Sequence, residues 1–186
     1  ITLSDSIKAN AKDTISLLNK NNIKTYMFTG DKKEIALKVS NDLGIDKTYY
    51  ELLPTDKFSY YDKVKKNDEL TAFVGDGIND APVLKRSDVG ISMGALGSSA
   101  AILASDIVLM NDDISNIWLA IKISKYTNGV IKENLIFALL TKSVILLLSV
   151  FGLANMWLAV FADTGVTLLT ILNSMKILRR FNKNDR

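Results

Sequence analysis

Charged side chains almost vanish from the last third of the chain, and this constrains the possible folds more than any other feature. Between residues 134 and 178 the only ionisable side chains are those of Lys142, Asp163 and Lys176. Two apolar runs, residues 135–153 and 156–178, each approach the roughly 20 residues that a helix needs to cross a bilayer. We therefore expect a transmembrane hairpin over residues 134–180. The alternative is a pair of buried helices in a soluble protein, but such helices would show regular polar faces, which these runs barely have.

Basic residues flank the apolar runs. Lys122, Lys125 and Lys132 precede them, and Lys176, Arg179, Arg180, Lys183 and Arg186 close them. The short connection around Ala154 and Asn155 carries no charge. Because cytoplasmic flanks are enriched in lysine and arginine, we expect the soluble part and both ends of the hairpin in the cytoplasm. This predicts a multi-pass protein of the cell membrane that has the lipid bilayer as a partner.

Residue types that are absent exclude several functions. The 186 residues include no cysteine and no histidine, so the chain alone cannot build a disulfide scaffold, a thiol nucleophile, a Cys or His zinc site or a Ser-His-Asp triad. The net charge of +3 is too small to argue for nucleic acid as a partner. Acid-base chemistry would have to come from carboxylates and lysines.

The first 133 residues alternate between helical and strand patterns. We expect helices over residues 7–18, 32–43, 56–67, 79–86 and 114–133, and strands over 23–28, 70–74, 89–93 and 106–110. Asp5 is a candidate helix start, whereas Asn21, Asn22 and Gly44 are candidate ends. Such alternation predicts an α/β fold with a doubly wound parallel sheet, whose catalytic groups follow the carboxyl ends of the strands.

Polar side chains gather after two of these strands. Thr29, Gly30 and Asp31 follow the first strand, Asp76, Asn79 and Asp80 follow the second, and Lys57 opens a helix between them. A hydroxyl, an ammonium group and carboxylates at one sheet edge are what a phosphate and its Mg2+ ion require. Each piece alone is weak, since Thr-Gly-Asp is more often a plain turn and a lone lysine is usually solvated. Their order makes phosphate chemistry the stronger hypothesis.

Three strings carry a resemblance to a known family. MFTGD at residues 27–31, LLPTDK at 52–57 and VGDGINDAPVL at 74–84 resemble signatures of P-type ATPases, cation pumps of the haloacid dehalogenase group. The resemblance implies a partial haloacid dehalogenase-like domain followed by the last two membrane spans. The domains it implies are a phosphorylation-domain part over 1–112, a helical connection over 113–133, the hairpin over 134–180 and a cytoplasmic tail over 181–186.

The resemblance also implies roles for individual residues. Thr29 and Lys57 would steady a phosphoryl group. Gly30 and Asp31, which follow Thr29, would be catalytic residues of the same signature. Asp76 would hold Mg2+ together with Asp80, and Asn79 and Asp80 would support the phosphorylation site. Ser99 and Leu103 stand where this branch commonly has acidic residues, so we assign them no function.

Several parts of such pumps are missing from these residues. The Asp-Lys-Thr-Gly-Thr string with the phosphorylated aspartate, the Thr-Gly-Glu string of the actuator domain and the nucleotide domain are not present. Because the chain also begins at Ile1, we expect it to be a piece of a longer protein whose other parts are its partners. Alone it should neither form an aspartyl phosphate nor turn over ATP.

Two charged residues within the apolar runs point to the transported ion. Lys142 and Asp163 each lie about seven residues into a run, so both approach the middle of the bilayer. In the heavy-metal branch of the family, zinc, cadmium and lead pumps have a lysine in the first of these spans and an Asp-x-Gly string in the second. Lys142 and Asp163-Thr164-Gly165 match this pattern. By this resemblance Asp163 would bind the cation and Lys142 would supply the counter-charge when the ion leaves. The simpler alternative is a structural salt bridge.

The leading hypothesis is thus the C-terminal part of a pump that exports zinc, cadmium or lead, using ATP and Mg2+. A second hypothesis is a non-catalytic remnant or membrane regulatory subunit with the same fold. A third is a membrane-tethered magnesium phosphatase, which would need its own nucleophile. The candidates Asp5, Asp13, Asp46 and Asp106 lie in helices, in a loop or before a strand, and none of them ends a strand.

Overall fold

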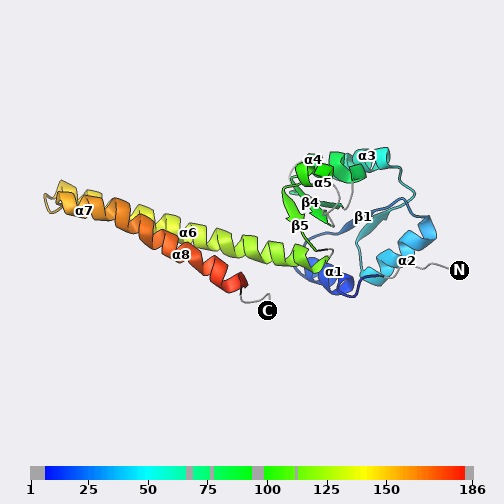
Figure 1. Cartoon of the computed structure of the whole chain (residues 1–186), viewed down its shortest axis with the longest axis horizontal. Helices are drawn as coiled ribbons and strands as arrows, with labels where there is room; N and C mark the ends of the chain where they lie inside the picture. The colour runs from blue at the N-terminus through cyan, green and yellow to red at the C-terminus, as the bar shows by residue number, and fades with distance from the viewer. Residues whose placement is uncertain (1–6, 66–68, 76–77, 94–98, 112, 183–186) are drawn as a thin grey trace. The chain divides into compact units, whose positions relative to one another are not determined.

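A computed structural model describes residues 7–65, 69–75, 78–93, 99–111 and 113–182. The chain divides into two compact units, Ile1–Trp118 and Leu119–Arg186 (Figure 1). The elements of the first unit are α1 (Ala11–Lys20), β1 (Tyr26–Phe28), α2 (Lys33–Leu43), β2 (Lys47–Tyr49), α3 (Pro54–Val64), β3 (Ala72–Gly75), the 3-10 turn η1 (Ile78–Asp80), α4 (Ala81–Arg86), β4 (Val89–Met93), α5 (Ser99–Ala104) and β5 (Ile107–Leu109). The long helix α6 (Ser115–Val150) runs into the second unit, which also holds α7 (Met156–Val160), the π-helical turn η3 (Phe161–Gly165) and α8 (Val166–Asn182).

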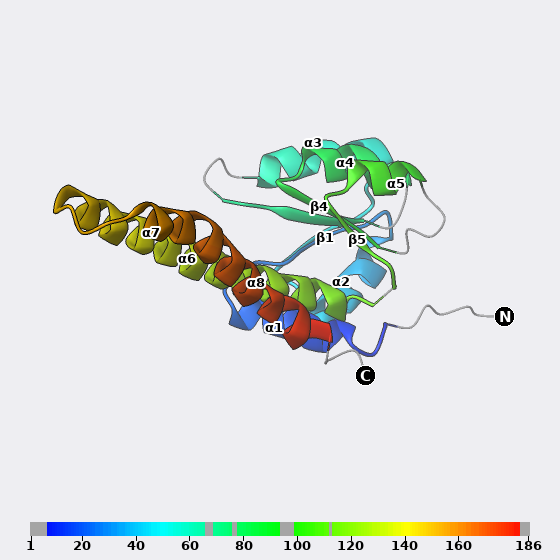
Figure 2. The same cartoon turned by 60° about the vertical axis from the view of Figure 1, so that its left-hand side comes forward.

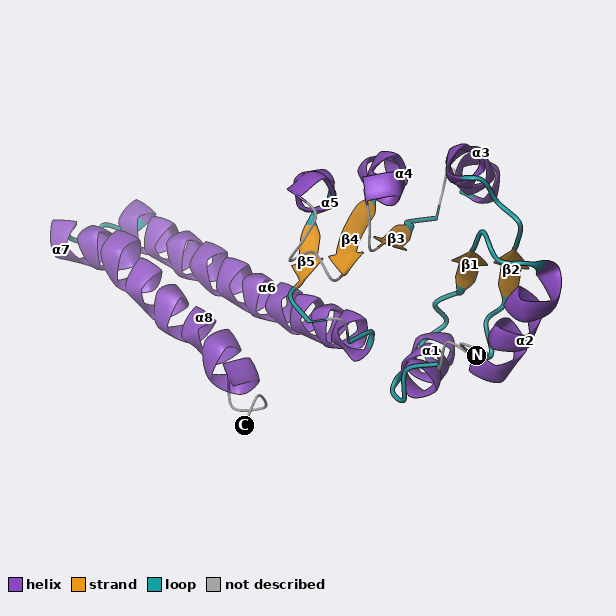
Figure 3. Ribbon diagram, turned by 45° about the vertical axis from the view of Figure 1, so that its right-hand side comes forward, coloured by secondary structure: helices purple, strands orange, loops and turns teal. Residues whose placement is uncertain are grey.

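All strand pairs in the described part of the chain are parallel. β1 pairs with β2, and β3, β4 and β5 form a second sheet in that order (Figure 3). Helices α3, α4 and α5 cover one side of the strands and α1 and α2 the other (Figure 2). The predicted α/β fold with helices on both faces is therefore confirmed, with its strands divided between two sheets.

Some elements differ from the sequence expectation. Strand β2 and helix α5 were not expected, because three and six residues are too few to show a clear period. The second predicted strand begins at Ala72 instead of Leu70, whose side chain is 93% exposed. Helix α1 begins at Ala11, and its C-cap at Asn21 agrees with the predicted end. Asp5 lies outside the described residues.

Three aspartates connect neighbouring strands at their amino-terminal ends. Each precedes a strand and accepts a hydrogen bond from a backbone N–H of the neighbouring strand segment. The pairs are Asp46 with Thr25 at 2.7 Å, Asp88 with Thr71 at 2.8 Å and Asp106 with Gly90 at 2.8 Å. Asp46 and Asp106, which we weighed as nucleophiles, thus lie at the edge opposite the carboxyl ends of the strands.

Asp88 is the most strongly bound of these carboxylates. Its Oδ1 accepts a 2.7 Å bond from Lys65 Nζ, and its Oδ2 accepts bonds from the N–H and the hydroxyl group of Thr71. The Lys65 bond, followed by the Thr71 bonds, lowers the pKa of Asp88 from 3.8 to about 2. The carboxylate is therefore charged throughout the neutral and mildly acidic range.

The core of the first unit lies between the strands and helices α3 to α5. Val83 and Leu84 of α4 are each 1% exposed and pack with Tyr61 and Phe73. The rings of Tyr61 and Phe73 meet edge to face at 6.0 Å, a favoured aromatic arrangement. This packing fixes α4 against β3, the strand that leads into the VGDGIND segment.

The second unit is a helical hairpin with an apolar surface. Two helical stretches, Ser115–Val150 and Met156–Phe181, are long and apolar enough to cross a membrane. In the most apolar part of the first stretch no residue is buried. If the two helices belonged to a soluble protein, this apolar surface would be exposed to water. Helix α6 is continuous, so the predicted connection and the first predicted span are parts of one helix. The predicted domain limits within it stay predictions.

Candidate functional site

The clearest contact at the carboxyl edge of the strands is an ion pair. Lys57 lies in the first turn of α3, which Pro54 begins, and Asp80 ends the turn that follows β3. Their Nζ and Oδ1 atoms are 2.8 Å apart, and the side chains are 20% and 9% exposed. The sequence expectation that a lysine and a carboxylate meet here agrees with this geometry. In this arrangement Lys57 neutralises a buried carboxylate.

Gly75 makes room for this carboxylate. A Cβ atom at this position would lie 2.8 Å from Asp80 Cβ and 3.1 Å from its Oδ2, which is closer than side chains pack. The first glycine of the VGDGIND string is therefore required by the close approach of Asp80. Asp76 lies outside the described residues, and Asn79 is exposed in the turn.

Thr29, Gly30 and Asp31 form a compact loop after β1. The Thr29 hydroxyl donates a 2.7 Å bond to Asp31 Oδ2 and accepts a 3.1 Å bond from the Asp31 N–H. In the described part of the chain, no hydrogen bond or ion pair joins this loop to Lys57 or Asp80. The structure thus forms two polar groups at the edge, one around Thr29 and one around Lys57.

Glu51 connects the Thr29 loop to the next segment, and the sequence analysis did not single it out. Its N–H donates a 2.9 Å bond to the Asp31 carbonyl, and its Oε1 accepts a 3.3 Å bond from the Lys33 N–H at the start of α2. Its φ of 56° is unusual for a residue with a side chain. Since glutamate has no preference for this conformation, no sequence signal could have revealed it.

The candidate metal ligands at this edge are carboxylates. Asp80 offers hard oxygen atoms, which suit Mg2+, although Oδ1 is already bonded to Lys57. Among the described residues, no three acidic side chains gather in one place. The donor type fits the predicted ion, and Asp76 would have to complete the ligand set.

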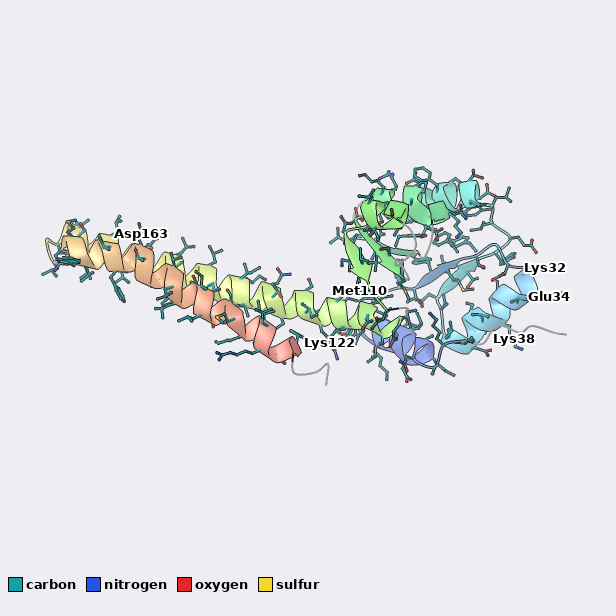
Figure 4. All side chains as sticks on the ribbon, viewed as in Figure 1. Lys32, Glu34, Lys38, Met110, Lys122 and Asp163 are labelled. Atoms are coloured by element: carbon teal, nitrogen blue, oxygen red, sulfur yellow. The ribbon has the colours of Figure 1, made fainter. Side chains whose placement is uncertain are left out.

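A second charged pair lies in the hairpin. Lys142 of α6 and Asp163 of η3 are joined by a 3.2 Å ion pair, which agrees with their similar expected depths in the two runs. Their side chains are 60% and 77% exposed, so the pair lies at the surface of the hairpin. Asp163 is labelled in Figure 4. Asp163 stands in the middle of a π-helical turn, a feature that often occurs at functional sites. No residue pattern indicated this turn.

Amides also join the two helices. Asn134 Nδ2 donates to Ser174 Oγ at 2.9 Å and to the Thr170 carbonyl at 3.2 Å, and Asn173 Nδ2 donates to Asn134 Oδ1 at 2.8 Å. Interhelical hydrogen bonds of this kind stabilise helix association in lipid. An asparagine directly before the first apolar run and another within the second were the signal that could have pointed to this contact.

The fold and its two polar sites define a class: a haloacid dehalogenase-like α/β unit on a chain that also carries an apolar helical hairpin. Residues 1–88 match the family model of haloacid dehalogenase-like hydrolases. The chain is 46% identical to a cadmium, zinc and cobalt-transporting ATPase of Bacillus subtilis, a match that covers 98% of this chain and 27% of that protein. It is 43% identical to a zinc-transporting ATPase of Synechocystis, covering 96% and 25% of the two chains.

A solved structure extends the likeness to both units. The crystal structure of a zinc-transporting PIB-type ATPase in the E2.Pi state superimposes with a TM-score of 0.85 and 34% identity, covering 94% of this chain and 28% of that one. The chain therefore belongs to the heavy-metal translocating P-type ATPases and corresponds to their C-terminal part. It spans about a quarter of the length of the curated relatives it matches.

Proposed function

We propose that the chain is the C-terminal portion of an ATP-driven pump that exports a divalent soft metal ion, zinc, cadmium or lead, through an aspartyl phosphate. The observation that carries this proposal is the ion pair between Lys142 and Asp163 in an otherwise apolar hairpin. Ionisable groups in such surroundings are costly and by default mark an ion path. The relatives are named as transporters of cadmium, zinc and cobalt, which supports a divalent metal ion as the transported substrate.

In the membrane, Asp163 would bind the cation and Lys142 would replace it as counter-charge after release. The 3.2 Å contact supports this exchange, because the Lys142 ammonium group reaches the Asp163 carboxylate. Both ends of the hairpin would face the cytoplasm of a multi-pass membrane protein. Further ligands would come from spans elsewhere in the complete pump, so the chain's own lack of cysteine does not argue against a soft metal.

At the sheet edge, Thr29 and Lys57 would hold the phosphoryl oxygens, and Asn79 and Asp80 would support the phosphorylated aspartate. When bound, Mg2+ would neutralise phosphoryl charge, and Asp76 and Asp80 are the carboxylates that would hold it. Lys57, whose side chain is 20% exposed, would exchange Asp80 for a phosphoryl oxygen.

The phosphorylated aspartate itself would come from the rest of the pump. In the described part of the chain, β1 pairs only with β2 and β3 only with β4, so each has one unpaired edge. We infer that the strand carrying the aspartate pairs with these edges, which would bring its carboxyl end to Thr29 and Asp80. ATP would be bound mainly by the nucleotide domain of the same pump, and this chain alone would be inactive.

The test uses the complete pump in proteoliposomes. Asp76→Ala should abolish Mg2+-dependent phosphorylation by ATP. Asp163→Ala should keep phosphorylation competence but lose zinc-, cadmium- and lead-stimulated ATP hydrolysis. Asp13→Ala, an exposed carboxylate on α1, is the matched control and should change neither.

Each outcome has a separate meaning. Normal phosphoenzyme in Asp76→Ala would remove the magnesium assignment, and unchanged metal stimulation in Asp163→Ala would make that carboxylate structural. If the unmodified protein forms no phosphoenzyme, the non-catalytic subunit hypothesis replaces the pump.

A further inference from the structure

The contacts between α6 and α8 give the hairpin a fixed register. Three contacts follow one another at steps of eight residues along α6: Lys142 with Asp163, Asn134 with Asn173, and Tyr126 with Arg180. The last is a cation–π contact of 4.5 Å, and the Tyr126 ring also meets Phe181 at 5.8 Å. Positions on the two helices can therefore be compared by depth.

The register also gives a depth scale for the bilayer. Ten residues on either side of Lys142 correspond to about 15 Å, half the thickness of a typical hydrocarbon core. In one direction this distance ends at Gly152, whose φ of 70° turns the chain after α6. In the other it ends at Lys132. If the charged pair lies at mid-bilayer, as the proposed function requires, Lys132 marks the cytoplasmic boundary of the core.

A group of cations lies at and beyond this boundary, and we call it the basic collar. It consists of Lys122, Lys125 and Lys132 on α6 and Lys176, Arg179 and Arg180 on α8. Glu133 is the only acidic residue between 119 and 182 besides Asp163. Figure 4 shows Lys122 and Asp163 far apart along the hairpin.

Three members of the collar lack an acidic partner within the described residues: Lys132, Lys176 and Arg179. Lys132 and Lys176 lie at one depth, since Asn134 and Ser174, two residues nearer the turn on each helix, are hydrogen-bonded at 2.9 Å. On α8, Lys176, Arg179 and Arg180 follow the three- and four-residue spacing that places side chains on one face. Among the described residues no acidic side chain neutralises their charge, and under the proposed membrane placement they lie at the depth of the phospholipid headgroups.

We propose that the basic collar binds the headgroups of anionic phospholipids in the cytoplasmic leaflet. This rests on the membrane placement in the proposed function and concerns a partner other than the cargo. Clusters of four to eight lysines and arginines beside a transmembrane helix attract anionic lipid, each charge strengthening the attraction roughly fivefold. Tyr126, with an apolar ring and a polar tip, is suited to the same interfacial level.

The experiment reconstitutes the 186-residue chain in phosphatidylcholine vesicles that contain traces of spin-labelled phosphatidylglycerol or spin-labelled phosphatidylcholine. We expect electron paramagnetic resonance to give a relative association constant for phosphatidylglycerol of about fivefold or more over phosphatidylcholine. Raising the salt to about 1 M should reduce this preference, because the Debye length falls to about 3 Å.

The variant Lys132→Gln, Lys176→Gln and Arg179→Gln should bring the preference close to unity. The matched control replaces Lys12, Lys20 and Lys38 by glutamine, which removes the same charge from exposed positions of the first unit. It should keep the full preference, which separates the collar from the effect of net charge.

Three failures are distinguishable. If the chain resists extraction from vesicles by salt and carbonate but shows equal association with both lipids, the lipid proposal is overturned and the collar only sets topology. If the chain does not remain in either vesicle, the membrane placement itself is wrong. Equal loss in the triple variant and in the control would also overturn the collar as the binding surface.

Discussion

The ion pair of Lys57 and Asp80 permits a quantitative test of the sheet edge. Replacing Lys57 by methionine preserves most of the side-chain volume but leaves the Asp80 carboxylate, 9% exposed, without its cation. Breaking a fully buried ion pair costs about 3–5 kcal/mol. Since the lysine is 20% exposed, we expect Lys57→Met to lower the stability of this region by about 2–3 kcal/mol.

A double-mutant cycle separates the pair from its surroundings. Asp80→Asn should cost less, about 1–2 kcal/mol, because the lysine that remains can extend to water. The double variant has no unpaired charge and should be about 2 kcal/mol more stable than the sum of the single effects predicts. The corresponding control is Lys38→Met on α2, an exposed lysine, for which we expect less than about 0.5 kcal/mol.

The assay is hydrogen exchange of the chain in detergent micelles, read on peptides that cover α4. Val83 and Leu84 are almost fully buried there, so their amides report the opening of the region around Asp80. A loss of 2–3 kcal/mol corresponds to roughly 30- to 150-fold faster exchange, provided that the region recloses faster than its open amides exchange. A change of less than threefold in Lys57→Met, or strictly additive effects, would refute the idea that Lys57 neutralises a buried carboxylate.

Three further predictions concern stability. Gly75→Ala should lower the free energy of unfolding by about 1–3 kcal/mol, because the new Cβ would overpack against Asp80. Gly129→Ala, where a Cβ has no neighbour within 4 Å, should instead stabilise its helix. Equal denaturation midpoints for the two variants would contradict this. Because the pKa of Asp88 is lowered to about 2, the stability that its carboxylate contributes is complete above pH 3.8 and is lost as the pH falls through 2. Asp88→Asn should therefore make stability depend less on pH between 4 and 2, measured as acid unfolding by circular dichroism. The free energy of unfolding of Glu51→Gly should exceed that of Glu51→Ala by about 1 kcal/mol, seen as a higher denaturation midpoint, because glycine adopts the φ of 56° without strain and alanine does not.

Much of the fold was predictable because its periodic patterns are strong. Helix α2 ends at Leu43 with Gly44 at φ 75°, and β4 spans Val89–Met93 as expected. Strand β2 was missed because Lys47, Thr48 and Tyr49 show no alternation over so few residues, and its place beside β1 depends on long-range pairing. Short strands of this kind are defined by their neighbours more than by their own residues.

The candidate site was predictable where chemistry follows from residue type and order. Lys57 and Asp80 were expected to meet at the sheet edge, and they do so at 2.8 Å. Glu51 could not be expected, because its position depends on a backbone conformation that glutamate does not favour. The space for Asp80 likewise became clear only when the distance to a Cβ on Gly75 was known.

The exposure of the hairpin charges leads to a last step of reasoning. Lys142 and Asp163 remain 60% and 77% exposed although they are paired. A pair so placed would contact lipid if the hairpin stood alone in a membrane, and intramembrane charges almost always face protein or water instead. The exposed side of this pair should therefore be covered by other spans, which are also the source of any further cation ligands. The π-helical turn holds Asp163, and the amides of Asn134 and Asn173 fix the register of the two helices. Under the proposed function this chain would supply one carboxylate and its counter-charge, so the choice between zinc, cadmium and lead would depend on ligands from those other spans.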